Sequence, residues 1–270
     1  MKRFICNSLF ILLAVSASAQ ARQIEVAAGW DKPPYIISRG HTGFELELVK
    51  SILNELGHQM VPIYVPMGRI PRMVSDGSVD IGLNMNPNHK INREFLSEIY
   101  IAYQNVAVSL TTRNVTVNSP ADLKNYTVIG FQTAKRVLGQ EYANAVNEHA
   151  GYLETPQQSR QVAMLVLGSV DVAVMDRNIF SFFKSKLPSN QQFPTTMHEI
   201  FPINFYHAGI PDPELRAEFN RVLGEMIQDG RYKSLIKRFH VTYLLDRIEH
   251  PMEEEFERKM EKANGDENLK

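Results

Sequence analysis

Two aromatic residues beside a pair of prolines are the first residues in this chain suited to hold a ligand. Trp30 and Tyr35 flank Pro33 and Pro34, directly after the apolar stretch 24–28. Proline fixes φ, so the loop is stiff, and open α/β sheets bind ligands beyond the carboxyl ends of their strands. We therefore expect Trp30 and Tyr35 to form an aromatic wall of a ligand site, with a place in the core as the alternative for either ring.

Asp176 is a second candidate, because it ends the apolar stretch 170–175. A buried carboxylate is costly unless it is paired, so the cationic group of a ligand would be a natural partner. The alternative is that Asp176 caps a helix that begins near Asn178, a position that Asp favours.

The motifs of common catalytic and metal sites are missing from the sequence. It contains no HExxH, no GxSxG, no phosphate-binding glycine loop and no Cys/His cluster, and its eight histidines are scattered. The sequence therefore predicts binding rather than catalysis, with no metal and no cofactor.

The amino terminus has the pattern of a secretory signal peptide. Lys2 and Arg3 precede the apolar stretch 4–15, and small residues at 17–19 and 19–21 suit cleavage. The apolar stretch is shorter than a spanning helix needs, although an uncleaved anchor remains the alternative. We expect residues 1–21 to be removed with Cys6, the only cysteine. The product would then be a periplasmic protein that is not embedded in the membrane and has no disulfide.

Composition narrows the class of partner. The formal charge of −1 becomes −3 once Lys2 and Arg3 are removed, and 44% of the residues are hydrophobic. With no basic patch, nucleic-acid binding is set aside. The acidic segment 241–270 is predicted to be a helical or disordered tail.

Strand and helix patterns alternate along the chain, which favours a mostly parallel sheet flanked by helices. Strands are predicted at 24–28, 60–65, 79–83, 103–110, 126–131, 152–154, 170–175 and 201–210. Helices are predicted at 44–56, 69–75, 135–148, 159–167, 178–185 and 213–230, the last with Leu215, Phe219, Val222, Leu223 and Met226 on one face.

The same four residues, Gly-Ser-Val-Asp, stand at 77–80 and at 168–171. Together with the aromatic loop and the closing stretch 213–232, their order resembles family 3 extracytoplasmic solute-binding proteins, the periplasmic receptors of amino-acid uptake systems. The resemblance implies the type II periplasmic-binding-protein fold, with two α/β lobes, each a mostly parallel sheet flanked by helices, and two hinge crossings.

The lobe boundaries follow from that resemblance. We expect residues 22–112 and 205–240 to form the first lobe and 113–204 the second, with the first crossing at 111–119. Ligand would bind in the cleft between the lobes.

The resemblance also assigns site residues. It places Trp30 and Tyr35 among the cleft aromatics and gives Asp176 the ammonium group of the ligand. Gln132 and Thr133 follow a strand and precede a helix, where such proteins present small polar residues and backbone N–H groups that suit an anion.

The segment that Asn84 opens departs from the family pattern. Amino-acid receptors carry Thr-Pro-Glu-Arg here, and in this chain Asn86 stands at the Thr and His89 at the Arg. Histidine cannot form the two-pronged contact by which arginine binds a carboxylate. Either Lys90 or Arg93 substitutes, or the ligand is not a standard α-amino acid.

Three further residues are singled out, and two of them, Arg69 and Glu45, each have two interpretations. Arg69 follows Pro-Met-Gly in an element that resembles a Pro-aromatic-x-Arg element of divergent members, so it either binds an anionic group in the cleft or caps a helix at the surface. Phe44 is expected beneath the aromatic loop. Glu45 either holds that loop by hydrogen bonds or is an exposed acid at the start of a helix.

Three functions are compatible with these features. The first is capture of a small polar solute for an ABC permease, by a protein that is monomeric like its family. The second is a receptor of the same fold that serves a membrane sensor. The third is an enzyme similar to the periplasmic prephenate or arogenate dehydratases, for which Glu199 would be the nearest acid to the strand 201–210.

Overall fold

The structure is a computed structural model, and it describes residues 21–248. The expected signal peptide, apart from Ala21, and the tail from residue 249 lie outside the described residues. The strands are β1 Gln23–Ala28, β2 Gln59–Tyr64, β3 Ile81–Met85, β4 Leu96–Leu110, β5 Val128–Phe131, β6 Tyr152–Thr155, β7 Val172–Asp176, β8 Thr195–His198 and β9 Ile203–Gly209. The helices are α1 Phe44–Glu55, α2 Ile70–Ser75, α3 Ala134–Val137, α4 Gln140–Val146, α5 Gln158–Val166, α6 Arg177–Ser185, α7 Pro213–Gln228 and α8 Arg231–Phe239.

The strands form one mixed sheet in the order β2-β1-β3-β9-β4-β7-β5-β6, and β8 adds to β4. Parallel strands lie at the two ends of this order, where β1 pairs with β2 and β3, and β5 pairs with β6 and β7. The middle is antiparallel, because β9 runs against β3 and β4, and β4 runs against β7. A mostly parallel sheet is therefore found at each end only.

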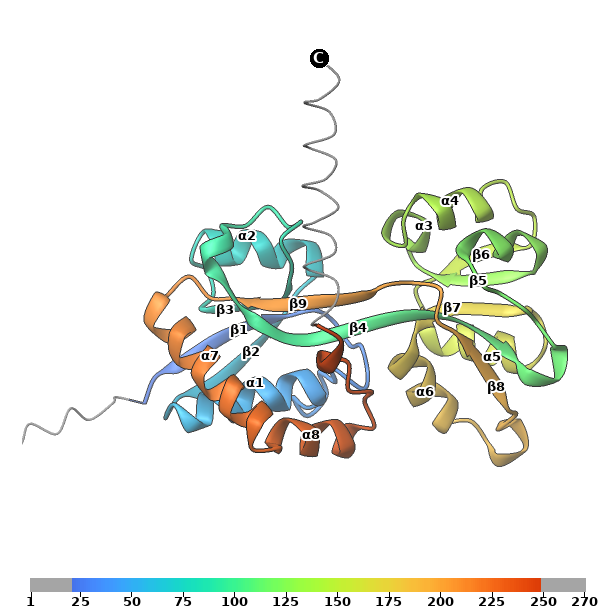
Figure 1. Cartoon of the computed structure of the whole chain (residues 1–270). Helices are drawn as coiled ribbons and strands as arrows, with labels where there is room; N and C mark the ends of the chain where they lie inside the picture. The colour runs from blue at the N-terminus through green and yellow to red at the C-terminus, as the bar shows by residue number, and fades with distance from the viewer. Residues whose placement is uncertain (1–20, 249–270) are drawn as a thin grey trace, which may run out of the picture.

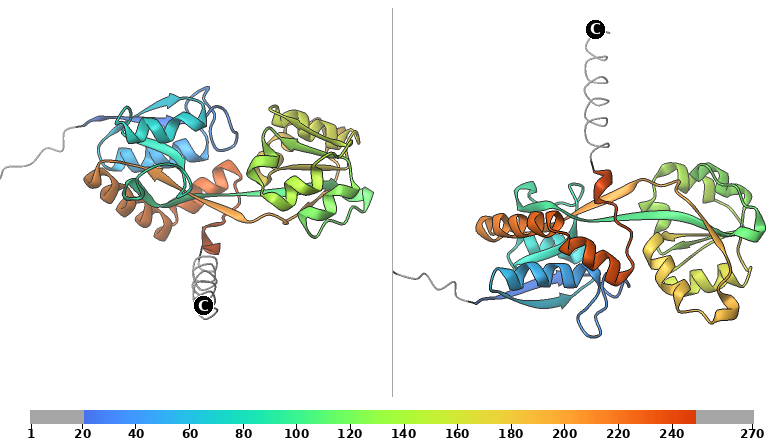
Figure 2. Two further views of the ribbon diagram at one scale, coloured as in Figure 1. Left: turned by 90° about the horizontal axis from the view of Figure 1, so that it is seen from above. Right: turned by 60° about the horizontal axis from the view of Figure 1, so that its bottom comes forward.

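The elements gather in two groups in space (Figure 1). The first group holds β1–β3, α1, α2, α7 and α8, and the second holds β5–β8 and α3–α6. Figure 2 shows from two further directions that β4 and β9 run between the groups.

The long strand β4 serves both groups. Residues from Leu96 to Gln104 pair with β9, whereas residues from Asn105 onward pair with β7 and β8. The change of partner thus lies within β4, upstream of the segment 111–119 in which the first crossing was expected. Since 96–110 contains neither glycine nor proline, no strong strand breaker precedes Leu110.

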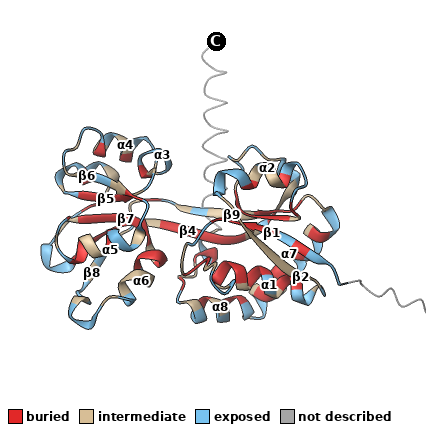
Figure 3. Cartoon of the chain, turned by 180° about the vertical axis from the view of Figure 1, so that it is seen from behind, coloured by how far each residue is buried: buried red, intermediate tan, exposed pale blue. Residues whose placement is uncertain are grey.

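The apolar faces of the helices cover the sheet of the first group (Figure 3). On α7, Leu215, Phe219, Val222, Leu223 and Met226 are the buried residues, as the helical spacing predicts. Phe44 at the start of α1 is fully buried and packs edge-to-face on Tyr232, with ring centroids 5.4 Å apart. Phe44 was expected beneath the aromatic loop; its ring is buried against α8, and its backbone N–H donates to the Pro34 carbonyl oxygen of that loop at 2.9 Å.

Two segments differ from the sequence prediction. The helix expected over 135–148 is divided into α3 and α4, because Gly139 adopts φ 91° between them. The strand β8 was not predicted, since Thr-Thr-Met-His carries too little apolar alternation to indicate a strand.

Candidate ligand-binding site

A cavity of about 450 Å³ lies where the carboxyl ends of β3, β5 and β7 approach β4 and β9. Residues from both groups of elements contribute to its wall. They are Lys32, Met67, Asn84, Asn86, His89, Tyr103, Asn105, Phe131, Gln132, Thr133, Val137, Gln158, Asp176, Ile179 and Tyr206.

Six of the nine residues expected from the sequence line this cavity: Asn84, Asn86, His89, Gln132, Thr133 and Asp176. The other three lie elsewhere. Trp30 is 61% exposed, Arg69 is exposed, and Tyr35 is fully buried behind the cavity wall.

Asp176 both caps a helix and faces the cavity. Its Oδ1 accepts hydrogen bonds from the backbone N–H of Asn178 (2.9 Å) and Ile179 (3.0 Å), which cap α6. The carboxylate also accepts from the Tyr35 hydroxyl (3.0 Å) and from the Gln104 N–H (3.3 Å). Burial raises the pKa of Asp176 above its ordinary value, against the opposing effect of these hydrogen bonds.

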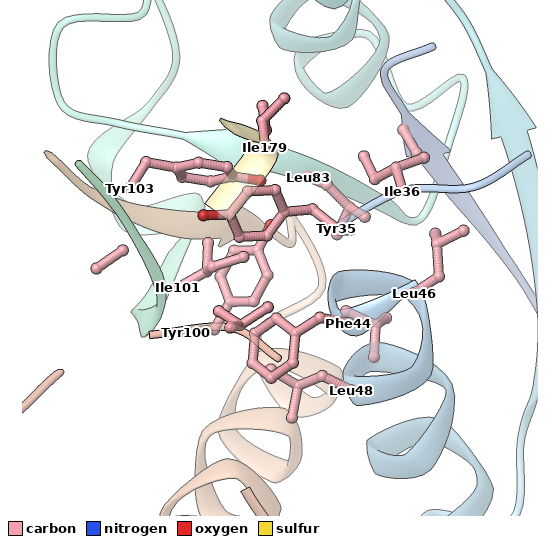
Figure 4. Packing of buried hydrophobic residues seen from close by; sticks show 14 of the residues in the cluster. Tyr35, Ile36, Phe44, Leu46, Leu48, Leu83, Tyr100, Ile101, Tyr103 and Ile179 are labelled. Atoms are coloured by element: carbon pink, nitrogen blue, oxygen red, sulfur yellow. The ribbon is translucent and has the colours of Figure 1, made fainter. Parts of the chain in front are cut away.

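Tyr35 lies behind the cavity wall and contacts two residues that line it, Tyr103 and Asp176. Its ring packs against Tyr103 with centroids 4.2 Å apart (Figure 4). Its hydroxyl donates to Asp176 and accepts from Asn178 Nδ2 (2.8 Å). The backbone N–H and hydroxyl of Thr242 donate to Asn178 Oδ1, which fixes the orientation of that amide. Tyr35 therefore acts on the cavity through Asp176.

Asn84 connects the cavity to a buried carboxylate. Asn84 is the last but one residue of β3 and has φ 59°, a left-handed conformation that asparagine tolerates better than most residues. Its Nδ2 donates to Glu45, and its Oδ1 accepts from Lys32 Nζ at 2.6 Å. Glu45 is fully buried and also accepts from the hydroxyls of Tyr100 and Tyr103. Glu45 is therefore not an exposed acid, and the partners of its carboxylate lie on β3 and β4 rather than in the aromatic loop, which Glu45 contacts through its backbone N–H and the Tyr35 carbonyl oxygen (3.0 Å).

Lys32 brings a positive charge to this network. Its ammonium group lies 4.0 Å from the centroid of the Tyr103 ring, a cation–π arrangement. Burial lowers the pKa of Lys32, while the carboxylates of Glu45 and Asp176 act in the opposite direction. Lys32 therefore balances the charge of Glu45 through Asn84.

His89 occupies the place that the resemblance gives to arginine. Its Nδ1 accepts from the Asn86 N–H at 3.3 Å, and burial lowers the pKa of the ring. The ring is therefore neutral at pH 7. Neither Lys90 nor Arg93 is among the residues that line the cavity.

The turn at Gln132 and Thr133 precedes α3, and two backbone N–H groups at this helix end are bonded to Glu154. Thr133 adopts φ 70°. Its N–H donates to Glu154 Oε2 (2.7 Å), and the Lys135 N–H donates to Glu154 Oε1 (3.1 Å). Burial alone would raise the pKa of Glu154, but these hydrogen bonds, the one from Tyr152 and the charge of Lys135 together lower it.

Comparison with known proteins identifies the family. The family model of bacterial extracellular solute-binding proteins, family 3, matches residues 24–242. The chain belongs to this family. No curated protein matches the chain.

Solved structures share the fold of this family 3 protein at low sequence identity. An ancestral arginine-binding protein bound to arginine is 20% identical with a TM-score of 0.61, over 80% of this chain and 97% of that one. The ligand-binding core of GluR0 with L-glutamate is 16% identical with a TM-score of 0.64, over 82% and 99%. A histidine kinase sensor domain is 18% identical with a TM-score of 0.60, over 81% and 96%.

Further residues of this family 3 protein that could take part in catalysis or metal binding lie outside the cavity wall. Glu199 forms ion pairs with Arg177 (3.0 Å) and Arg247 (3.4 Å). His207 Nδ1 lies 2.5 Å from the Ser97 carbonyl oxygen, as a structural histidine would.

Within residues 21–248, no group of three or more metal-ligating side chains is found, and no helix is long and apolar enough to cross a membrane.

Sequence reasoning missed Lys32, Tyr103, Asn105, Gln158 and Tyr206 as lining residues. Lys32 stands inside the aromatic loop, so its position next to a predicted wall was a usable signal. Tyr103, Asn105 and Tyr206 lie on the two strands that run between the groups, and no motif marks which of their residues face the cavity.

Proposed function

We propose that the chain is an exported binding protein that captures a small polar solute in this cavity and delivers it to a membrane permease. The observation that carries the proposal is the wall itself, to which both groups of elements contribute polar side chains. Carboxamides, hydroxyls, one ammonium group and one carboxylate around an aromatic floor suit a solute held by a few directed contacts.

The two groups would act as lobes. They are joined by β4 and β9 (Figure 2), and rotation about these strands would open and close the cavity as a hinge. Closure would remove the solute from water on both sides. A membrane permease could then distinguish the closed, loaded form from the open form.

The test is thermal unfolding of residues 22–270 with amino acids, amines, dicarboxylates, sugars and prephenate. A solute at 100 times its Kd should add about 2.7 kcal/mol to the free energy of unfolding, or roughly 5–10 °C in Tm for a protein of this size. Asn105→Ala, in the cavity wall, should reduce the shift, and Asn147→Ala, after α4, should not. A cooperative melt that no solute shifts, with no co-purified solute in native mass spectrometry, would contradict the proposal.

An experiment in cells distinguishes delivery of the solute to a permease from signalling to a membrane sensor. Deletion of the gene should abolish uptake of the bound solute in the permease case. In the sensor case, uptake persists and a solute-dependent change in gene expression is lost.

We propose binding rather than turnover. Glu199, the acid considered for a dehydratase, is held in two ion pairs and does not line the cavity. Prephenate incubated with the protein should therefore be recovered unchanged.

A further inference from the structure

Negatively charged groups outnumber positively charged groups around the cavity. Among the described residues, its wall carries one ammonium group, Lys32, and one carboxylate, Asp176, while His89 is neutral and no arginine contributes. Glu45 lies fully buried behind the wall and adds a second carboxylate. Two negative charges therefore face one positive charge.

Lys32 is linked by hydrogen bonds to one of these carboxylates, although the charges of both act to raise its pKa. It donates to Asn84, and Asn84 donates to Glu45, so a single amide joins the ammonium group to that carboxylate. Asp176 is 6% exposed and receives hydrogen bonds only from neutral donors. Since a buried carboxylate without a cation is costly, Asp176 is the group that a bound cation would stabilise.

The cavity offers little to a carboxylate. Glu154 already accepts from the N–H groups of Thr133 and Lys135 at the start of α3. His89 cannot form a two-pronged contact. A carboxylate placed near this helix end would also be repelled by Glu154, whose lowered pKa keeps it ionised.

Aromatic rings in the wall favour a cation instead. Tyr103 and Tyr206 both line the cavity and lie edge-to-face with centroids 5.4 Å apart. The ammonium group of Lys32 already uses Tyr103 in this way. Ring faces attract cations and repel carboxylates.

We propose that the solute is an organic amine without a carboxylate group, with its ammonium directed at Asp176. The inference rests on the proposed function, because it requires that the cavity binds a solute at all. Such an amine has no carboxylate for an arginine to hold, and among the described residues no arginine lines the cavity.

The test compares compounds that differ only in a carboxylate. Calorimetric titration would use agmatine against arginine, cadaverine against lysine, and histamine against histidine. At least one amine should bind about ten- to hundredfold more tightly than its parent amino acid, the size expected when a charged group is bonded rather than left without a partner.

The outcomes separate this inference from the proposed function. Amino acids that bind as tightly as their amines would overturn the inference and leave solute binding intact. If the protein binds a sugar or a dicarboxylate but no amine, the inference is likewise overturned and solute binding is left intact. Absence of binding across the whole solute panel would contradict both proposals.

A variant tests the role assigned to Glu154. Glu154→Ala leaves the N–H groups of Thr133 and Lys135 without their carboxylate, so the difference in affinity between amine and amino acid should shrink. Glu141→Ala, an exposed change in the first turn of α4, is the matched control and should keep the full difference. Circular dichroism verifies that the variants are folded. If Glu154→Ala is unstable, Glu154→Gln replaces it in the same titrations. A difference that is the same in Glu154→Ala as in the parent protein would overturn the exclusion of carboxylates by Glu154.

Discussion

Two helices begin at the edge of the cavity, and a carboxylate caps each of them. At α6 the carboxylate is Asp176, the residue before the helix, which accepts from the N–H groups of Asn178 and Ile179. At α3 it is Glu154, which reaches across from β6 to the N–H groups of Thr133 and Lys135. The capping hydrogen bonds are alike, since each carboxylate accepts from two backbone N–H groups at the beginning of its helix.

The surroundings give these two carboxylates opposite properties. Asp176 is almost fully buried, has no cation within ion-pair distance among the described residues, and has a raised pKa because of that burial. Glu154 is only half-buried and lies beside Lys135, so hydrogen bonds and charge outweigh burial and its pKa is lowered. The carboxylate at α6 can therefore bind a cation, whereas the carboxylate at α3 repels an anion.

The largest expected effect comes from neutralising the α6 cap. Asp176→Asn keeps an oxygen that can accept from the N–H groups and from Tyr35 but removes the charge, so solute affinity should fall about ten- to hundredfold. Asp212→Asn is the matched control, because Asp212 caps α7 through the N–H groups of Glu214 and Leu215, and it is not part of the cavity wall. Calorimetric titration measures both variants. Equal affinity in Asp176→Asn and in the parent protein would show that the two helix ends do not differ in the way described.

Much of this comparison could be anticipated from the sequence. An apolar strand that ends in Asp indicates a helix cap, and Asp176 is one. The apolar face of α7 follows from helical spacing alone. These features are local, so residue types and their intervals are sufficient to predict them.

Other features depend on contacts between distant segments. Tyr35 and Trp30 share one stiff loop, yet Tyr35 is fully buried and Trp30 is 61% exposed. The packing of Tyr103 from β4 against Tyr35 is long-range and leaves no trace in the loop sequence. The capping of α3 by Glu154 is likewise hidden, because it depends on the pairing of β5 with β6.

The second prediction concerns pH. An amine binds the ionised form of Asp176, so affinity should fall as the pH is lowered through the pKa of that group, which burial raises above 3.8. Below this pKa the loss approaches about tenfold per pH unit. Protonation of His89 at low pH would add a positive charge to the cavity and weaken binding further, whereas Lys32 loses no charge when the pH is lowered. Asp176→Asn separates the two effects, since its residual pH dependence belongs to His89. An affinity that rises on acidification would contradict the assignment.

The smallest expected effect is on the stability of the protein without solute. The ionised carboxylates of the two caps should make contributions of opposite sign to the free energy of unfolding. The pKa of Glu154 is lowered on folding, so its contribution to stability is complete above about 4.5, the ordinary pKa of glutamate, and is lost as the pH falls through the folded value. The pKa of Asp176 is raised, so its ionised form costs stability: the cost is absent below about 3.8, the ordinary pKa of aspartate, grows as the pH rises above that value and is complete above the folded pKa.

Urea unfolding at pH 7 should therefore show Glu154→Gln to be less stable by about 1 kcal/mol, because the change replaces one of the two oxygens that accept from the N–H groups and removes a stabilising charge. Asp176→Asn, which keeps a capping oxygen and removes the buried charge, should be as stable as the parent protein or more so. The protein must first be unfolded and dialysed, because bound solute would stabilise the parent and mask the difference. A decrease of equal size in both variants would mean that the hydrogen bonds alone matter, and that burial does not distinguish the two caps.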